Sequence, residues 1–290
     1  MAQTIETRDK RTLEVHEGGD PEGFPILIHH GTPSAGLPYE PHAELAREQG
    51  LRLIAYDRPG YGGSTRAKNR RVEDCVADVT EIADTLRLDR FAMWGISGGG
   101  PHALACAALC DDRLKAVASL AAVAPYGADG LDWHEGMGED NHVEFGKVLE
   151  GEEALRAYCE QASEEMRAAQ PEELVRVLDS LLGPEDRSVL TGRFAEYLLE
   201  CERHSLERGV DGWIDDDFAF VEPWGFELGE ISRPVLLLHG EDDRFVPVSH
   251  GRWLAARIPG VDARIGPADG HLTLFERRMR EVNAWLLSHS

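Results

Sequence analysis

Short apolar runs alternate with amphipathic stretches along the first 125 residues, and this alternation restricts the possible folds more than any other feature. Four runs are apolar nearly throughout, as is typical of strands buried on both faces: residues 25–29, 51–56, 91–96 and 116–123. Between the second and third runs, apolar residues from Val72 to Leu86 recur at helical spacing opposite an acidic face. Strands that alternate with helices predict a mostly parallel sheet with helices on both faces.

The rest of the chain predicts an insertion into this sheet. Residues 4–8 and 12–16 form the pattern of an initial hairpin, and strand patterns return at 234–239 and 262–265, which makes eight strands in total. Between Tyr126 and Glu230 only helix patterns occur, including one over 155–169 and one from Pro171 to Leu182. We therefore expect an α/β core of residues 1–125 and 231–290, with a helical cap of residues 126–230 inserted after the sixth strand.

Composition limits the partners of the chain. The 53 acidic and 30 basic residues give a net charge of −23, which repels phosphate backbones and anionic lipids, so neither nucleic acid nor a membrane is an expected partner. No apolar run approaches the ~20 residues of a spanning helix, and residues 1–10 do not resemble a signal peptide. The five cysteines fit neither a disulfide framework nor a CxxC metal site. We expect buried, reduced thiols and a cytoplasmic location.

The strongest chemical motif is Gly95-Ile96-Ser97-Gly98-Gly99, which fits G-x-S-x-G. It follows an apolar strand and precedes an Ala-rich helical stretch, which is the context that a nucleophile elbow requires. A helix N-terminus at this point also favours developing negative charge. The sequence therefore predicts that Ser97 is a nucleophile, although a glycine-rich turn with an idle serine would show the same pattern.

A serine nucleophile needs a base, and the base needs an acid that orients it. Asp243 lies just after the strand at 234–239, and His271 lies in the loop between the next strand and the last helix. Each residue alone is explained by ordinary helix or turn capping, but all three lie in chain order, each just past a strand. Asp242 is the alternative acid.

Other motifs predict no cofactor and no metal. The segment from Gly60 to Gly63 follows a strand but does not satisfy G-x-G-x-x-G, and no HExxH cluster occurs. The triplet Asp215-Asp216-Asp217 lacks the spacing of a calcium loop, and we expect it to be a solvated acidic turn.

These features together resemble the α/β-hydrolase family with a helical cap, over essentially the whole chain. The motifs that carry the resemblance are His30-Gly31-Thr32-Pro33, the Asp57–Ser64 segment, the elbow at Ser97, the stretch from Gly240 to Pro247, and Gly270-His271. The resemblance implies that the backbone N–H groups of Thr32 and Gly98 form the oxyanion hole and that the acid is Asp243. It also implies that His30 shapes the oxyanion loop rather than acting as a base.

The expected activity is hydrolysis of an ester or related acyl bond of a small molecule through an acyl-enzyme on Ser97. A C–C bond hydrolase, a lactonase, an aminopeptidase, a perhydrolase and a ligand-binding protein without turnover remain alternatives, because a fold does not determine a substrate. The end of the insertion is aromatic, and its residues either line the pocket or attach the cap to the core: Trp213, Phe218, Phe220, Trp224 and Phe226.

Overall fold

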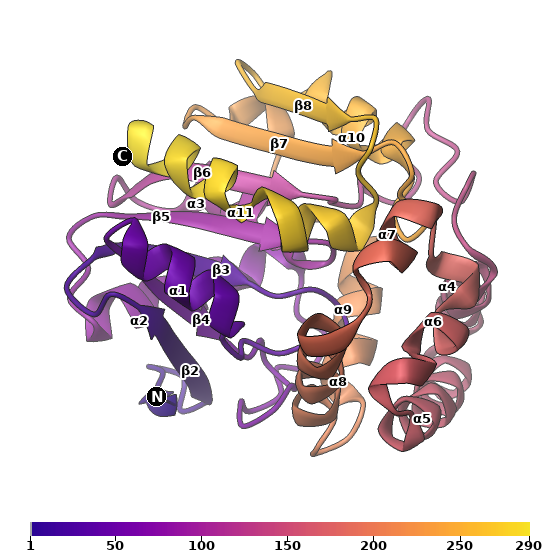
Figure 1. Ribbon diagram of the computed structural model, residues 1–290. Helices are drawn as coiled ribbons and strands as arrows, with labels where there is room; N and C mark the ends of the chain where they lie inside the picture. The colour runs from indigo at the N-terminus through magenta and orange to yellow at the C-terminus, as the bar shows by residue number, and fades with distance from the viewer. Residues whose placement is uncertain (1) are drawn as a thin grey trace.

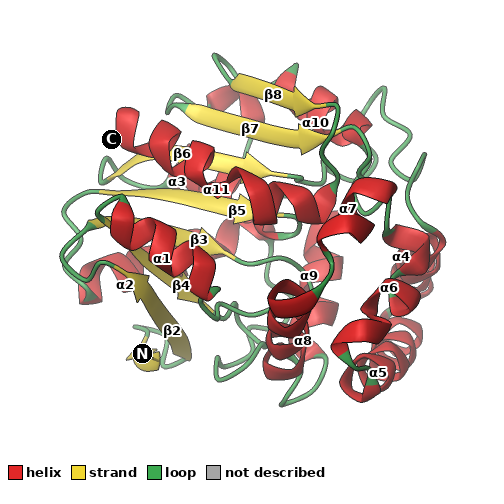
Figure 2. Ribbon diagram, viewed as in Figure 1, coloured by secondary structure: helices red, strands yellow, loops and turns green. Residues whose placement is uncertain are grey.

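A computed structural model of the chain describes residues 2–290 and contains one eight-stranded sheet. The spatial order is β1-β2-β4-β3-β5-β6-β7-β8, in which β1–β2 and β2–β4 pair antiparallel and all other neighbours pair parallel. This confirms the predicted fold class (Figure 2). The strands are β1 (Ala2–Glu6), β2 (Thr12–Gly19), β3 (Phe24–His29), β4 (Leu51–Tyr56), β5 (Phe91–Ile96), β6 (Leu114–Leu120), β7 (Val235–Gly240) and β8 (Asp262–Gly266).

Helices cover both faces of the sheet, because alternate residues of the central strands face two separate cores. On one face, α1 (Glu40–Glu48) and α11 (His271–Ser288) contribute Ala46 and Leu286 to a cluster with Trp94. On the other face, α2 (Cys75–Thr85), α3 (Gly99–Leu109) and α10 (Val248–Ala255) pack against strand residues such as Met93. The five cysteines are all buried and unpaired, as expected.

Six helices and three short 3-10 turns occupy the chain between β6 and β7. The six helices lie beyond the carboxyl ends of the central strands (Figure 1). The helices are α4 (Glu139–Glu150), α5 (Glu152–Ala168), α6 (Leu174–Val177), α7 (Pro184–Val189), α8 (Gly192–Ser205) and α9 (Asp211–Val221), and the turns are Pro171–Glu173, Asp179–Leu181 and Leu228–Glu230. No helix formed by residues 2–290 is long and apolar enough to cross a membrane.

The single helix predicted from Pro171 to Leu182 is wrong. The segment instead forms a 3-10 turn, the one-turn helix α6 and a second 3-10 turn, because the backbone leaves helical geometry at Leu178 (φ −97°, ψ 18°). The break lets Leu174 and Leu182 join one apolar cluster with Leu199 of α8. Helical spacing of apolar residues therefore did not require a continuous helix.

Candidate active site

Ser97 lies on a tight turn between β5 and α3, in a strained backbone conformation with φ +55°. Only small neighbours fit this turn, since a Cβ added to Gly95 would collide with the Gly99 carbonyl. Two backbone hydrogen bonds hold the strained residue: Ser97 N–H donates to the Leu120 carbonyl at 2.9 Å, and the Ser97 carbonyl accepts from Gly100 N–H at 2.8 Å. Strain of this kind is common where a side chain must be presented to a ligand.

His271 and Asp243 form a buried hydrogen-bonded pair. His271 Nδ1 lies 2.8 Å from Asp243 Oδ2, while Asp243 Oδ1 accepts from the Val246 N–H at 2.8 Å. Since the carboxylate can only accept, the proton lies on Nδ1 and Nε2 is left as the acceptor. The Phe245 ring stacks on the imidazole, with 4.6 Å between ring centroids. The alternative acid, Asp242, instead accepts from the backbone N–H of Glu185 at 3.2 Å.

The charge state of His271 reflects two opposing effects. Burial favours the neutral imidazole, whereas the Asp243 carboxylate, through its charge and its hydrogen bond, and the more distant Asp186 favour the imidazolium. The attraction prevails, so the pKa of His271 is raised above its ordinary value of 6.5.

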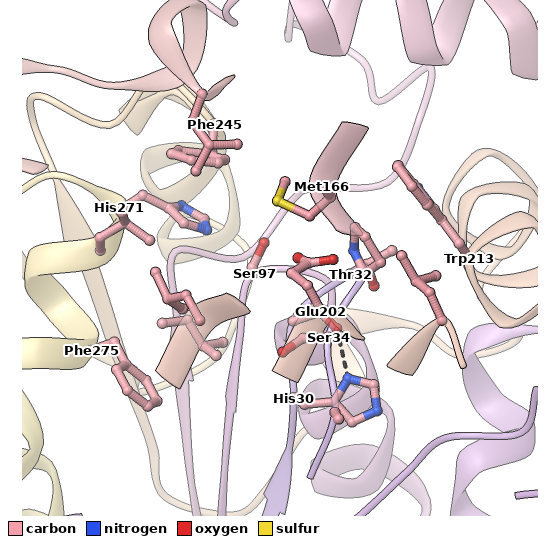
Figure 3. A pocket seen from close by; sticks show the side chains of 18 of the residues that line it. His30, Thr32, Ser34, Ser97, Met166, Glu202, Trp213, Phe245, His271 and Phe275 are labelled. Atoms are coloured by element: carbon pink, nitrogen blue, oxygen red, sulfur yellow. Dashed lines mark hydrogen bonds between the residues drawn. The ribbon is translucent and has the colours of Figure 1, made fainter. Parts of the chain in front are cut away.

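Ser97 and His271 line one cavity of about 800 Å³ between the core and the inserted helices. Figure 3 shows the serine hydroxyl and the imidazole facing the same space. Met166, Glu202 and Trp213 line it from the insertion. Of the five aromatic residues considered from sequence, Trp213 lines this cavity, and the other four pack in or against the hydrophobic core. The cavity volume of about 800 Å³ suits a small molecule.

The two residues predicted to form the oxyanion hole lie against each other. A Cβ added to Gly98 would collide with Thr32 Oγ1 and crowd the Phe220 ring, so the elbow packs directly on the loop after β3. His30, in this loop, accepts a hydrogen bond from the Arg58 N–H at 3.0 Å, and its Nδ1 lies 2.7 Å from the Gly31 carbonyl. Burial and the nearby Arg58 lower the pKa of His30 to about 3. The neutral ring thus shapes the loop through backbone contacts.

The expectation of a solvated acidic turn at residues 215–217 is wrong, because all three aspartates are buried on α9. Asp216 accepts hydrogen bonds from Thr32 Oγ1 at 2.7 Å and Tyr61 Oη at 2.8 Å, and pairs with Arg58 at 2.6 Å and with Arg70 at 2.5 Å. Arg58 also donates to Thr32 Oγ1 at 2.9 Å. These partners come from loops distant in sequence, so no local pattern revealed them. Asp216 therefore joins the inserted helix α9 to the loop that carries Thr32.

A second carboxylate missed by the sequence reading is Asp186 of α7. It accepts hydrogen bonds from the backbone N–H groups of His271 and Leu272 at 2.8 Å each and of Thr273 at 3.0 Å. These are N–H groups that a helix leaves free at its first turn. The prediction that His271 lies in a loop is accordingly wrong: His271 is the first residue of α11, and Asp186 of the insertion caps that helix.

Two sets of side chains within residues 2–290 have donor atoms close enough to hold a metal ion. The set of His29, Cys75 and Cys106 is fully buried, and burial raises the pKa of both thiols, which keeps them neutral. The set of Glu14, His16, Asp57 and His204 is already hydrogen-bonded: His204 Nε2 lies 2.9 Å from Asp57 Oδ2, and Glu14 accepts from the Gly63 N–H at 2.7 Å. Of the residues in these two sets, His16 alone lines the cavity that contains Ser97.

Comparison with known proteins identifies the family. Residues 25–278 match the family model described as alpha/beta hydrolase fold, which is most of the chain. The protein therefore belongs to the alpha/beta hydrolase family and is an enzyme of that fold, as the resemblance implied.

Individual relatives are distant but span nearly the whole chain. A 2-hydroxy-6-oxononadienedioate/2-hydroxy-6-oxononatrienedioate hydrolase of Burkholderia vietnamiensis is 25% identical, covering 94% of this chain and 89% of its own. An esterase of Exiguobacterium antarcticum superposes with a TM-score of 0.71 at 20% identity, covering 99% of this chain and 98% of its own. A bromoperoxidase of Bacillus anthracis has a TM-score of 0.70 at 22% identity and 99% coverage of both chains. The two structures share the fold.

Proposed function

We propose that this protein is a serine hydrolase that cleaves an ester or related acyl bond of a small molecule through an acyl-enzyme on Ser97. The observation that carries the proposal is the His271–Asp243 hydrogen bond at 2.8 Å beside a cavity that Ser97 also lines. Removing the Ser97 proton requires an acceptor nitrogen, and the tautomer that Asp243 selects leaves His271 Nε2 in that role.

In the proposed mechanism, Ser97 Oγ attacks the carbonyl carbon while its proton passes to His271 Nε2. The carbonyl oxygen gains the negative charge and accepts hydrogen bonds from the backbone N–H groups of Thr32 and Gly98, each worth about 3 kcal/mol in the transition state. The imidazolium then protonates the leaving group as the acyl-enzyme forms. Water attacks the acyl-enzyme, gives its proton to His271, and releases the acid as Ser97 regains its hydrogen.

The inserted helices act as a cap in this proposal. Residues 126–230 supply the wall of the cavity opposite the elbow, and Asp186 and Asp216 attach that wall to the segments bearing His271 and Thr32. A small-molecule substrate is supported by the volume of about 800 Å³. Hydrolysis of a C–C bond is the second candidate, because a hydrolase named for a dienedioate aligns with 94% of the chain.

The test is covalent labelling by a fluorophosphonate together with turnover of activated esters. We expect the wild-type protein to be labelled and to hydrolyse short p-nitrophenyl esters, and Ser97→Ala to lose both properties. Ser34→Ala is the matched control, because Ser34 lines the same cavity and its loss should leave labelling intact. Labelling that survives in Ser97→Ala, or a wild-type protein that is never labelled, would contradict the proposal.

A further inference from the structure

The aspartate, glutamate and lysine residues that line the cavity all come from the inserted helices, and four of these five are acidic: Asp140, Glu144, Lys147, Glu165 and Glu202. No arginine within residues 2–290 lines the cavity. The one lysine, Lys147, already pairs with Glu150 at 2.8 Å. The core side of the cavity contributes apolar, hydroxyl and imidazole groups. The cap wall is therefore acidic and lacks a free cation to balance it.

Glu202 of α8 is the unsatisfied member of this wall. Its side chain reaches the cavity that Ser97 and His271 face (Figure 3). Its Oε2 atom is closed to solvent and has no hydrogen-bond partner, and no donor is described for either carboxyl oxygen within residues 2–290. An ionised carboxyl without a partner is costly in a buried site, and a positive charge held in the cavity beside Glu202 would offset that cost.

The surroundings of Glu202 increase its need for a positive partner. Burial and the nearby carboxyl of Glu144 raise the pKa of Glu202 to about 8, and no cation opposes them. Glu144, from α4, accepts from Trp213 Nε1 at 2.6 Å and lies against Asp217 of α9. On the core side, His30 is neutral, and His271 is held by Asp243.

We propose that Glu202 determines specificity by selecting substrates that carry a cationic ammonium group and that the acidic cap wall disfavours substrates with carboxylate tails. The inference rests on the proposed acyl hydrolysis at Ser97. It also separates this chain from the relative named for a dienedioate, because a dicarboxylate would meet acids here and no arginine. A carboxylate usually requires an arginine or lysine in a buried site.

The experiment compares acetylthiocholine with 3,3-dimethylbutyl thioacetate, which has nearly the same shape but no charge. Neither substrate titrates, so ionisation of His271 cancels in the ratio of their kcat/KM values. We expect wild type to prefer the cationic ester by about tenfold above pH 8, with a smaller preference near pH 7, where most of Glu202 is protonated. Glu202→Gln should bring the ratio close to one at every pH.

Glu200→Gln is the matched control, since Glu200 is an exposed acid of the same helix that does not line the cavity. This variant should keep the wild-type ratio. A wild-type ratio of one or less, or an unchanged ratio in a folded Glu202→Gln, would overturn the inference. The wild-type pH series tests it even if that variant does not fold.

A failure of the proposed function has a different result. Turnover of the neutral ester without charge preference would refute only the role of Glu202, whereas absence of both turnover and fluorophosphonate labelling would refute acyl hydrolysis. If neither thioester is cleaved but labelling occurs, protection against labelling decides. Phenyltrimethylammonium should protect more strongly than the isosteric tert-butylbenzene, and equal protection would reject the inference.

Discussion

At the scale of single residues, the state of His271 governs when the proposed reaction can start. Only the neutral imidazole can accept the Ser97 proton. Asp243 and Asp186 outweigh burial and raise the pKa of His271, so the neutral form appears at higher pH than for an ordinary histidine. An unperturbed histidine would give the pH–rate profile an acidic limb near a pKa of about 6.5. The raised pKa of His271 predicts a limb above that value.

We therefore predict that kcat/KM for a neutral ester falls as the pH is lowered through a value above 6.5. Asp243→Asn removes the charge that stabilises the imidazolium, so the limb should move to lower pH. Because the tautomer is lost as well, kcat should fall by about 10⁴-fold. Asp242→Asn is the control, since Asp242 contacts the Glu185 backbone rather than His271. A limb that does not move in Asp243→Asn would show that another group controls the ionisation.

Residues with a local signature could be predicted, whereas residues defined by distant partners could not. Ser97 lies in a turn whose glycines are visible in the sequence, and the structure explains them by close backbone contacts. Asp216 lies in a run of three aspartates that reads as solvated surface, yet it contacts Arg58, 158 positions away. Nothing in the local sequence distinguishes a solvated run of aspartates from a buried run that pairs with distant arginines.

At the scale of elements, the structure connects the short helix α7 to the start of α11. The Asp186 carboxylate accepts hydrogen bonds from three backbone N–H groups of α11, so a residue of the inserted helix α7 caps the helix that begins with His271. Caps normally come from the residue just before a helix. Here that position is Gly270, whose side chain offers no oxygen, and the cap is supplied by a different helix.

Asp186→Ala should lower the free energy of unfolding by about 1–3 kcal/mol, because three N–H groups in the first turn of α11, two of them buried, lose their acceptor. We also expect at least a tenfold lower kcat, since the first turn that positions His271 is released. Glu185→Ala is the neighbouring control: Glu185 pairs with Arg277 at 3.2 Å near the surface, and its loss should change stability by less than about 0.5 kcal/mol. Urea unfolding and ester turnover measure the two effects. Equal behaviour of the two variants would exclude a capping role.

The elements that were predicted best are those buried on both faces. The patterns at 51–56 and 91–96 coincide with β4 and β5, because a strand between two helical layers must be apolar at nearly every position. The insertion was harder to divide into elements. Between Pro171 and Leu182 the helical spacing was present, but packing against α8 decided where the helix ended.

At the scale of the whole molecule, charged residues join the insertion to the core at separate points. Asp216 of α9 pairs with Arg58 and Arg70, and His204 of α8 pairs with Asp57 at 2.9 Å. Asp216 is fully buried, and the charges of Arg58 and Arg70 lower its pKa well below the ordinary range. The network adjoins Thr32, so the position of the insertion and that of the proposed oxyanion loop are coupled.

This coupling predicts the consequence of removing Asp216. Asp216→Ala leaves Arg58 and Arg70 buried without their carboxylate, and breaking a buried pair on one side costs about 3–5 kcal/mol. Asp211→Ala, on the same helix, removes a carboxylate that is 40% exposed and pairs with Arg66 and Arg156, and it should cost less than about 1 kcal/mol.

Thr32→Val keeps the proposed N–H donor but loses the side-chain contact with Asp216. We expect Thr32→Val to lower kcat more than it raises KM and to destabilise the protein less than Asp216→Ala does. An unchanged kcat in Thr32→Val would show that the network only attaches the insertion to the core and does not position the proposed oxyanion loop.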